Sequence, residues 1–167
     1  MKTTCGALII ADKRFILICH PTRHAPNQWD IVKGQVDPDE SKSDAMHREF
    51  LEETGVNMST FVDKLIDYSD LTGKEYVYKH KKKKLHGFIG IAIGGILDVA
   101  YMKCTSVVTG YKNLPPFPEV DAFAWIDIAD MDLLHESQQH FIHDVMKNTE
   151  YLSCAVVKKT KKSHIYG

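Results

Sequence analysis

The segment from Ser41 to Gly55 constrains the fold more than any other part of this sequence. Ser41, followed by an aspartate three residues later, is typical of a helix start, and Gly55 is typical of the residue after a helix end. A helix between them would place Glu49, Glu52 and Glu53 on one face, because positions i, i+3 and i+4 lie side by side. The sequence therefore predicts a helix of about four turns that carries a cluster of carboxylates.

The charge of this region is strongly concentrated. Residues 37–53 hold seven acidic residues against two basic ones, a net charge of −5, whereas the whole chain of 167 residues has a formal net charge of −1. Clustered carboxylates repel one another unless a cation neutralises them. Their hard oxygen atoms suit Mg²⁺ or Mn²⁺ better than Zn²⁺. A solvated acidic helix face would have the same composition, so the spacing of neighbouring residues has to decide between the two interpretations.

The spacing of glycines and charged residues around the helix resembles the Nudix box. In this sequence the box reads GQVDPDESKSDAMHREFLEETGV, from residue 34 to residue 56. Its fixed positions are Gly34, then after five residues Glu40, then after seven residues Arg48, Glu49 and Phe50, then after one residue Glu52 and Glu53, and after one more Gly55 and Val56. All are occupied, although Phe50 stands where a smaller aliphatic residue is more common. On these residues the chain is identified as a member of the Nudix (MutT-type) hydrolase family.

The resemblance implies the fold and the domain organisation. It implies an α+β fold, an α/β/α sandwich with a mixed β-sheet, in which the box forms a loop, a helix and a second loop. We expect a single domain over residues 1–167, with a basic tail that frays from about residue 158. Hydrophobic patterning independently predicts strands at 5–10, 15–19, 29–32, 61–68, 75–79, 85–99 and 122–126, a helix at 136–148 and a short last strand after residue 151. We expect residues 101–109 to pair back onto the strand at 85–99.

The resemblance also implies a metal site and a reaction. Glu52 and Glu53 would be the principal Mg²⁺ ligands, with Mn²⁺ as a substitute, and Glu49 would be a further ligand or the general base. The implied reaction is hydrolysis of a diphosphate bond in a nucleoside diphosphate-linked substrate. A diphosphate is a polyanion that resists attack by water, so bound cations that screen its oxygens accelerate the reaction. A nearby carboxylate can take the proton from the attacking water.

Other positions of the family pattern would support these carboxylates. Arg48 would hold them in register by hydrogen bonds, with Glu40 as its partner. Gly34 would allow a sharp turn into the loop, and the backbone carbonyl of Lys33 would be another metal ligand. Gly55 would end the helix.

One more carboxylate is expected from outside the box. Members of the family often recruit an acidic residue from a loop that precedes a tryptophan-containing strand. Glu119 is the best candidate, in the segment before Trp125, and Asp121 is the second candidate. A solvated loop acid is the alternative interpretation of this position.

The sequence says less about the substrate. Residues 27–34 resemble the entry to the box of Nudix proteins that act on dinucleoside polyphosphates and RNA 5′ ends, although Val32 stands where proline is typical. Trp29 and Lys33 are therefore candidate substrate-binding residues. Residues 79–84 hold five lysines and a histidine, which could bind a polyphosphate or RNA, although a solvated hairpin turn would look the same. The candidates for phosphate contacts and base stacking in this second region are Tyr76, Tyr78 and Lys79.

Several alternatives stay open for the function. A dinucleoside polyphosphate or an RNA 5′ end is the first expectation, and ADP-ribose, another nucleotide sugar or a nucleoside triphosphate is the alternative. A non-catalytic module that binds nucleotide or RNA is an alternative of another class. Degenerate Nudix modules usually lose acids of the box, and all of these acids are present here.

Composition narrows the cellular context. The four cysteines form no CxxC pair, which argues against a zinc site and against a disulfide framework. The apolar run near the N-terminus is too short for a signal peptide or a membrane span. We therefore expect a cytoplasmic protein without a membrane partner. The sequence leaves open whether the chain forms a homodimer.

Overall fold

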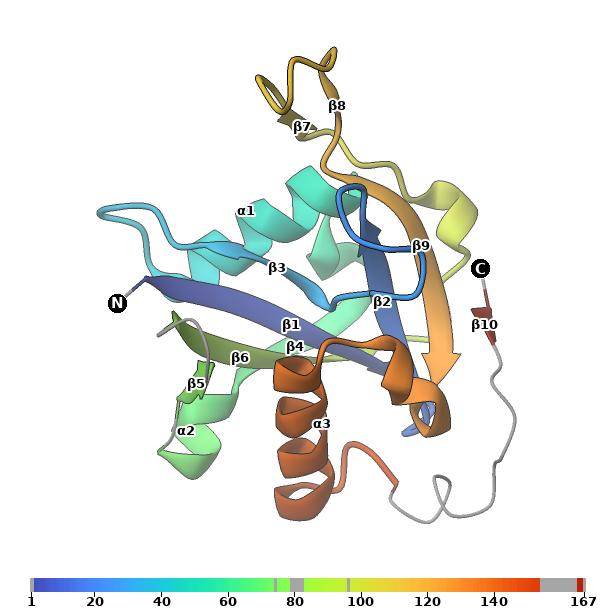
Figure 1. Cartoon of the computed structure of the whole chain (residues 1–167). Helices are drawn as coiled ribbons and strands as arrows, with labels where there is room; N and C mark the ends of the chain where they lie inside the picture. Colours follow the sequence, from blue (N-terminus) through green and yellow to red (C-terminus); the bar gives the residue numbers. More distant parts are fainter. Residues whose placement is uncertain (1, 74, 79–82, 96, 154–164, 167) are drawn as a thin grey trace.

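A mixed β-sheet forms the centre of the molecule (Figure 1). The structure, a computed structural model, describes residues 2–73, 75–78, 83–95, 97–153 and 165–166, and residues 76–78, 83 and 165–166 by their backbone only. The strands follow the order β10 (Ile165–Tyr166), β9 (Val120–Asp127), β2 (Phe15–Pro21), β1 (Thr3–Ala11), β6 (Lys83–Ala92) and β4 (Val62–Asp67). Two short strands lie off this path: β3 (Val32–Gln35) pairs with β1, and β5 (Tyr76–Tyr78) pairs with β6. Only the pairing of β1 with β6 is parallel among these strands.

Helices cover both faces of this sheet (Figure 1). The helices are α1 (Lys42–Thr54), α2 (Tyr68–Thr72) and α3 (Glu136–Asn148), with 3-10 turns at Met58–Thr60, Val99–Tyr101 and Ile128–Leu133. Successive residues of a strand point to opposite faces, so in β1 the side chains of Leu8 and Ile10 pack in the core beside α3, and those of Ala7 and Ile9 pack in the core beside α1. The predicted α/β/α sandwich is confirmed.

Both ends of α1 form as the sequence predicts. The Ser41 hydroxyl accepts a hydrogen bond from the Asp44 backbone N–H at 3.0 Å, and Gly55 has a left-handed φ of 72° while its N–H donates to the Leu51 carbonyl at 2.8 Å. Phe50, the unusual residue of the box, is fully buried and packs against Phe61 with ring centroids 5.7 Å apart. The larger side chain therefore fills the space between the helix and the 3-10 turn that follows it.

Two predicted strands have the wrong extent. The strand predicted at 29–32 is β3 instead, at Val32–Gln35, because Trp29 and Asp30 form only isolated bridges, with Leu134 and Cys19. The strand predicted at 85–99 ends at Ala92, because the glycines at 94 and 95 take φ values of 71° and 92° and turn the chain.

The predicted pairing of residues 101–109 with the long strand is wrong. Instead, β7 (Val107–Val108) pairs with β8 (Phe117–Pro118) in a separate two-stranded sheet. This β7–β8 hairpin stands out from the body of the molecule beyond one end of α1 (Figure 1). Helix α2 was not predicted, because a five-residue helix is too short to show a period.

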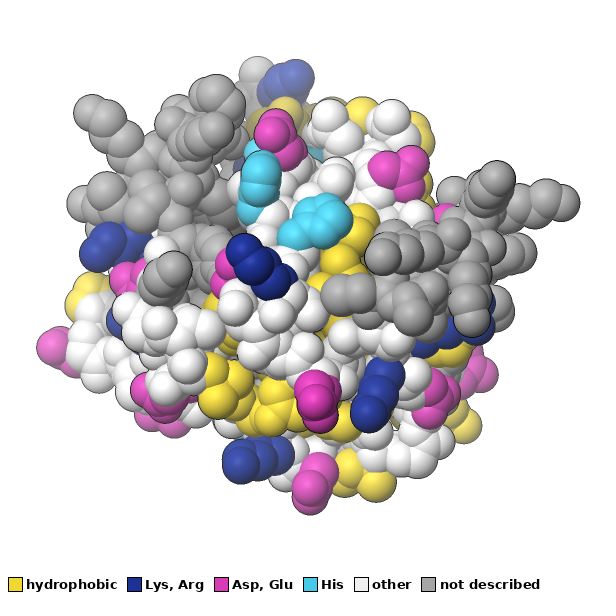
Figure 2. All heavy atoms as spheres, turned by 90° about the horizontal axis from the view of Figure 1, so that it is seen from below, with side chains coloured by type: hydrophobic (Ala, Val, Ile, Leu, Met, Phe, Trp, Pro, Cys, Tyr) yellow, Lys and Arg dark blue, Asp and Glu magenta, His cyan; other side chains and the backbone are white. Residues whose placement is uncertain are grey.

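The C-terminal helix α3 has the bounds that its apolar spacing predicts. Seen from below the view of Figure 1, acidic and basic side chains are interspersed among the described residues (Figure 2). Of the predicted frayed tail, residues 158–164 lie outside the described residues. The last strand is β10, which pairs with β9, and the described residues just after 151 are not in a strand. In the described part of the chain, no helix is long and apolar enough to cross a membrane.

A partly buried cluster of acidic and basic side chains joins the start of α1 to the sheet. His86 of β6 is 3% exposed, and its ring nitrogens lie 2.8 Å from Asp67 Oδ2 and 2.8 Å from Glu75 Oε1. The Lys42 ammonium also lies 2.8 Å from Glu75 Oε1. Hydrogen bonds from Lys42 and His86 lower the pKa of Glu75 from 4.5 to about 2. Burial alone would raise the pKa of Asp67, but its hydrogen bonds with His86 and Ser69 lower it.

This cluster should make stability depend on acid pH. Because the pKa of Glu75 is lower in the folded state, its stabilising effect is fully present above about pH 4.5 and is lost as the pH falls towards 2. Glu75→Gln should therefore flatten the acid side of the free energy of unfolding plotted against pH. Urea unfolding at a series of pH values measures this slope, with Glu136→Gln on the exposed surface of α3 as the control. Equal acid slopes in wild type and Glu75→Gln would contradict the prediction.

Candidate active site

The carboxylates of α1 meet in a cavity of about 390 Å³. Glu49, Glu52 and Glu53 line it, and Glu119, which lies between β8 and β9, also lines it. Glu53 is 5% exposed and Glu49 is 9% exposed, whereas the side chain of Glu52 is 44% exposed. The predicted grouping of the three helix glutamates on one face is confirmed. The cavity extends from the buried Glu53 to the partly exposed Glu52.

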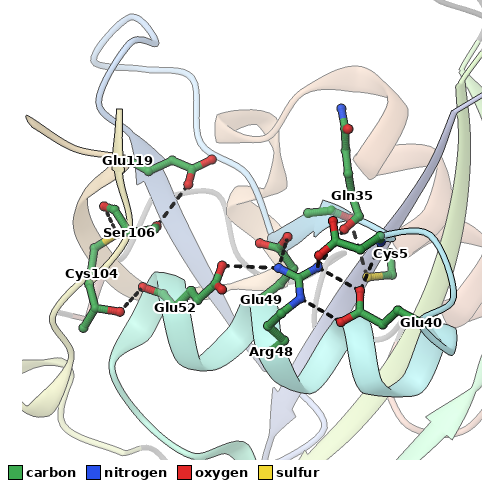
Figure 3. A network of polar contacts seen from close by, with 12 residues as sticks. Cys5, Gln35, Glu40, Arg48, Glu49, Glu52, Cys104, Ser106 and Glu119 are labelled. Atoms are coloured by element: carbon green, nitrogen blue, oxygen red, sulfur yellow. Dashed lines mark hydrogen bonds and ion pairs between the residues drawn. The ribbon is translucent and has the colours of Figure 1, made fainter. Parts of the chain in front are cut away.

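Arg48 ties the acids of the box together (Figure 3). Its Nε and Nη2 donate to the two oxygens of Glu40 at 2.7 and 3.0 Å, a bidentate pair. Its Nη1 donates to Glu49 at 2.9 Å and to Glu52 at 3.3 Å, and Nη2 also donates to the Gln35 carbonyl at 3.0 Å. The hydrogen bonds that Arg48 donates to Glu40, then to Glu49, raise the pKa of its guanidinium. The predicted contact of Arg48 with Glu40 is confirmed.

Burial makes the two inner carboxylates difficult to ionise. Burial raises the pKa of Glu53 well above its ordinary value, and the charges of Glu119 and Glu49 raise it further. The charge and the backbone N–H of Lys33 lower the pKa, but by less. Burial also raises the pKa of Glu49, although Arg48 lowers it. Enclosed carboxylates are costly to ionise unless a positive charge compensates them. A cation in the cavity would supply that compensation.

The donor set fits a hard divalent cation, but its side chains are turned towards protein partners. In the described part of the chain, no three Asp, Glu, His or Cys side chains converge closely enough to hold an ion. Arg48 Nη1 holds both Glu49 and Glu52, and the Ser106 hydroxyl donates to Glu119 at 3.0 Å (Figure 3). Carboxylate oxygens are the ligands that Mg²⁺ and Mn²⁺ prefer. Binding such an ion therefore needs these carboxylates to turn from their protein partners towards a common point.

Gly34 serves a different purpose from the predicted sharp turn. It lies within β3, paired with Cys5 of β1, and its φ is not in the left-handed region. A Cβ atom at this position would overlap the carboxyl group of Glu49. The expectation of a turn is therefore wrong, and the absence of a side chain is what lets Glu49 approach the strand.

Lys33 lies in the cavity wall beside Glu53. Its backbone N–H donates to the Glu53 carboxylate, and its Nζ lies 3.5 Å from Asp30 Oδ2. Asp30 is itself held by Gln138 of α3, whose Nε2 donates to Asp30 Oδ1 at 2.8 Å. The Lys33 ammonium is thus held at the cavity. The predicted role of its carbonyl as a metal ligand stays a prediction.

The structure separates the two candidates outside the box. Glu119 lines the cavity with the α1 acids, whereas Asp121 accepts a hydrogen bond from His20 Nδ1 at 2.6 Å. His20 Nε2 also lies 2.9 Å from the Ala25 carbonyl. Burial lowers the pKa of His20, but these two hydrogen bonds raise it by more, so the net shift of the pKa is upward. Glu119 is therefore the acid that can join the α1 carboxylates.

The structure supports the predicted substrate-binding residues less than it supports the acids of the box. Trp29 is not among the described residues that line the cavity: its Nε1 donates to the Pro26 carbonyl at 3.1 Å, and its ring centroid lies 5.4 Å from that of His20. Tyr76 and Tyr78 lie in β5, of which only the backbone is described. Lys79 lies outside the described residues. The roles of these three residues stay predictions.

Sequence reasoning missed several residues of the cavity. Arg23 and His24 line it from the loop between β2 and β3, and the buried Asp30 lines it from the end of that loop. Turn-forming residues identified this segment as a loop but said nothing of its direction. The one usable signal was an arginine and a histidine side by side in a loop that leads directly into the box.

The comparison with protein families gives one result. A family model described as the NUDIX domain matches residues 2–145. This span includes the complete box, Glu119 and most of α3. A comparison with curated proteins finds no match.

Solved structures share the fold at low sequence identity. The dihydroneopterin triphosphate pyrophosphohydrolase of E. coli is 19% identical with a TM-score of 0.60, over 88% of this chain and 96% of that one. A MutT protein from Methanosarcina mazei Go1 is 20% identical with a TM-score of 0.58, over 87% and 93%. A bifunctional NMN adenylyltransferase/ADP ribose pyrophosphatase from Francisella tularensis, complexed with AMP and a Mn ion, is 20% identical with a TM-score of 0.50, over 87% and 41%. With the family match, the cavity and the complete box in agreement, the chain belongs to the NUDIX domain family and is a Nudix pyrophosphohydrolase.

Proposed function

We propose that the cavity binds Mg²⁺, or Mn²⁺ in its place, and hydrolyses a diphosphate bond in a nucleoside diphosphate-linked substrate. The observation that carries this proposal is the buried Glu53, whose pKa is raised by burial and by Glu119 and Glu49 in the same cavity. Such a group is unfavourable in a protein without a compensating charge. Glu49, Glu52 and Glu53 would hold the cation, with Glu119 as a fourth acid.

Each group in the cavity would have a different role in the reaction. The cation, when bound, would screen the phosphate oxygens and make the attacking water more acidic. Glu49 is a suitable general base, because a carboxyl group with a raised pKa accepts a proton more readily than an ordinary one. Arg48 would keep Glu49 and Glu52 in position from behind, through its bidentate pair with Glu40. Lys33 would contact the phosphate groups through its ammonium.

A dinucleoside polyphosphate or an RNA 5′ end is the proposed substrate class. The activities for which two proteins with this fold are named supply the alternatives, a pterin triphosphate for the E. coli protein and ADP-ribose for the Francisella one. Trp29, Tyr76, Tyr78 and Lys79 remain proposed contacts for the nucleotide part.

A substrate panel with Mg²⁺ and with Mn²⁺ tests this proposal. Dinucleoside polyphosphates, ADP-ribose, nucleoside triphosphates and 5′-triphosphate RNA would each be incubated with the protein, and phosphate release and product identity would be recorded. We expect cation-dependent cleavage of at least one class and none in EDTA. Tight binding without cleavage of any compound would instead favour a non-catalytic binding module.

The lysine-rich segment at 79–84 gives a separate proposal of RNA contact. Residues 79–82 lie outside the described residues, so the proposal rests on the sequence alone. Binding of a single-stranded RNA should weaken steeply as salt rises if these lysines contact the backbone. An affinity that does not change with salt would rule out this contact. Analytical ultracentrifugation would test whether the chain forms a homodimer.

A further inference from the structure

The loop between β2 and β3 is fixed against the segment that carries Glu119. The Thr22 N–H donates to the Glu119 carbonyl at 3.0 Å, and the Thr22 hydroxyl donates to the Pro118 carbonyl. At the start of the loop, His20 contacts both Asp121 and the Ala25 carbonyl. The loop lies beside β9 and below the β7–β8 hairpin (Figure 1). Loop and hairpin segment therefore form one wall of the cavity, separate from the wall made by α1.

Arg23 is the cation that this wall presents. The chain has three arginines, and the other two are committed to acids: Arg14 to Asp127 at 2.6 Å and Arg48 to Glu40. Among the described residues, Arg23 forms no ion pair, although it lines a cavity that contains five acids. A guanidinium beside so much negative charge but paired with none of it is available to a ligand.

An aromatic residue lies against the Arg23 guanidinium. The Arg23 Cζ lies 5.6 Å from the centroid of the Tyr111 ring, within the range of a cation–π contact. The Tyr111 ring packs edge-on against Phe117 at 6.0 Å, and Phe117 belongs to β8. Stacking on an aromatic ring occupies a face of the guanidinium and leaves its N–H groups at the edge, which is the geometry that binds phosphate oxygens.

We propose that Arg23, stacked on Tyr111, binds a phosphate group beyond the diphosphate that is cleaved. The inference rests on the proposed function, in which the cation and Lys33 contact the diphosphate itself. Arg23 lies on the other wall, where a longer phosphate chain would reach it. The enzyme therefore prefers substrates with three or more consecutive phosphates, such as dinucleoside polyphosphates, over ADP-ribose and other two-phosphate compounds.

Diadenosine di-, tri- and tetraphosphate test this directly, because they share both ends and differ only in phosphate number. The kcat/KM of wild type, Arg23→Gln and Arg23→Lys would be measured on all three with Mg²⁺. Arg23→Gln should lower kcat/KM on the tri- and tetraphosphate by about 10- to 100-fold, mainly through KM, as expected for loss of a hydrogen bond between charged groups. The value for the diphosphate should stay within about twofold. Arg23→Lys should recover only part of the loss, because an ammonium lacks the planar fork.

Variants at Tyr111 test the stacking. Tyr111→Phe keeps the ring and should behave as wild type, whereas Tyr111→Ala should show a weaker form of the Arg23→Gln pattern. Lys64→Gln, which removes one charge from the exposed part of β4, is the matched control and should change none of the three values.

The outcomes separate this proposal from the proposed function. If Arg23→Gln lowers kcat/KM equally on all three compounds, or on none, the proposal is overturned. If wild type cleaves none of them, the dinucleoside polyphosphate assignment fails, and calorimetric binding of the same compounds still tests Arg23. Equal affinities of wild type and Arg23→Gln for the tetraphosphate would then overturn the proposal independently.

Discussion

Replacing Glu53 with glutamine should abolish hydrolysis and, at the same time, stabilise the protein when no cation is bound. Glu53 is buried, and burial together with the charges of Glu119 and Glu49 raises its pKa. Glutamine keeps the shape and removes the charge, so the repulsion disappears from the cation-free state. The same change removes the innermost carboxylate ligand. Removing even an outer partner of a metal ligand typically costs 10- to 100-fold, so we expect a loss of more than about 100-fold in kcat.

Two measurements on Glu53→Gln separate catalysis from folding. Product formation with Mg²⁺ should fall, while the free energy of unfolding in EDTA, from urea titration at pH 8, should rise above that of wild type. Addition of Mg²⁺ should stabilise wild type and leave the variant unchanged, because only a cation that binds the folded state adds stability. Glu136→Gln, an exposed acid of α3, should match wild type in every measurement. An active Glu53→Gln enzyme, or one that Mg²⁺ still stabilises, would refute the assignment of Glu53 as a ligand.

The sequence predicted this helix well because its signals are local. The capping residues of α1 lie three or four positions from the backbone groups that they satisfy, and the i, i+3 and i+4 spacing of the three glutamates follows from helix geometry alone. The contact of Arg48 with Glu40 spans only eight positions of the box. Contacts between residues this close in the chain can be predicted without knowing the rest of the fold.

The remaining parts of the site depend on contacts that the sequence does not show. Thr22 meets Pro118 across 96 positions, and Gln138 meets Asp30 across 108. Spacing predicts neither pair, so the wall that carries Arg23 could not be foreseen. The strand predicted at 85–99 is too long for a related reason: the apolar run predicts a continuous strand, but two consecutive glycines turn the chain after Ala92.

Gly34→Ala should inactivate the enzyme by displacing one carboxylate. A methyl group at residue 34 would overlap the Glu49 carboxyl group, which Arg48 holds at 2.9 Å from Nη1. Either Glu49 turns away from Arg48 or β3 shifts, and a shift of β3 would move the Lys33 N–H that binds Glu53. Both results disturb the acids proposed to hold the cation. We expect kcat to fall by more than about 100-fold, because displacement of a ligand should cost at least as much as loss of an outer partner.

Gly87→Ala is the matched control, because it places the same methyl group in another crowded position, on the other face of the sheet. There the methyl would meet the Phe141 ring of α3, away from the cavity. Overpacking of this kind typically costs about 1–3 kcal/mol of stability. Gly87→Ala should therefore unfold at lower urea concentration than wild type and yet retain kcat at temperatures where it is folded. If Gly34→Ala lost stability and kept its activity, the position of Glu49 against the strand would not matter for catalysis. If both variants lost activity in proportion to stability, the glycine would be a folding requirement rather than a feature of the site.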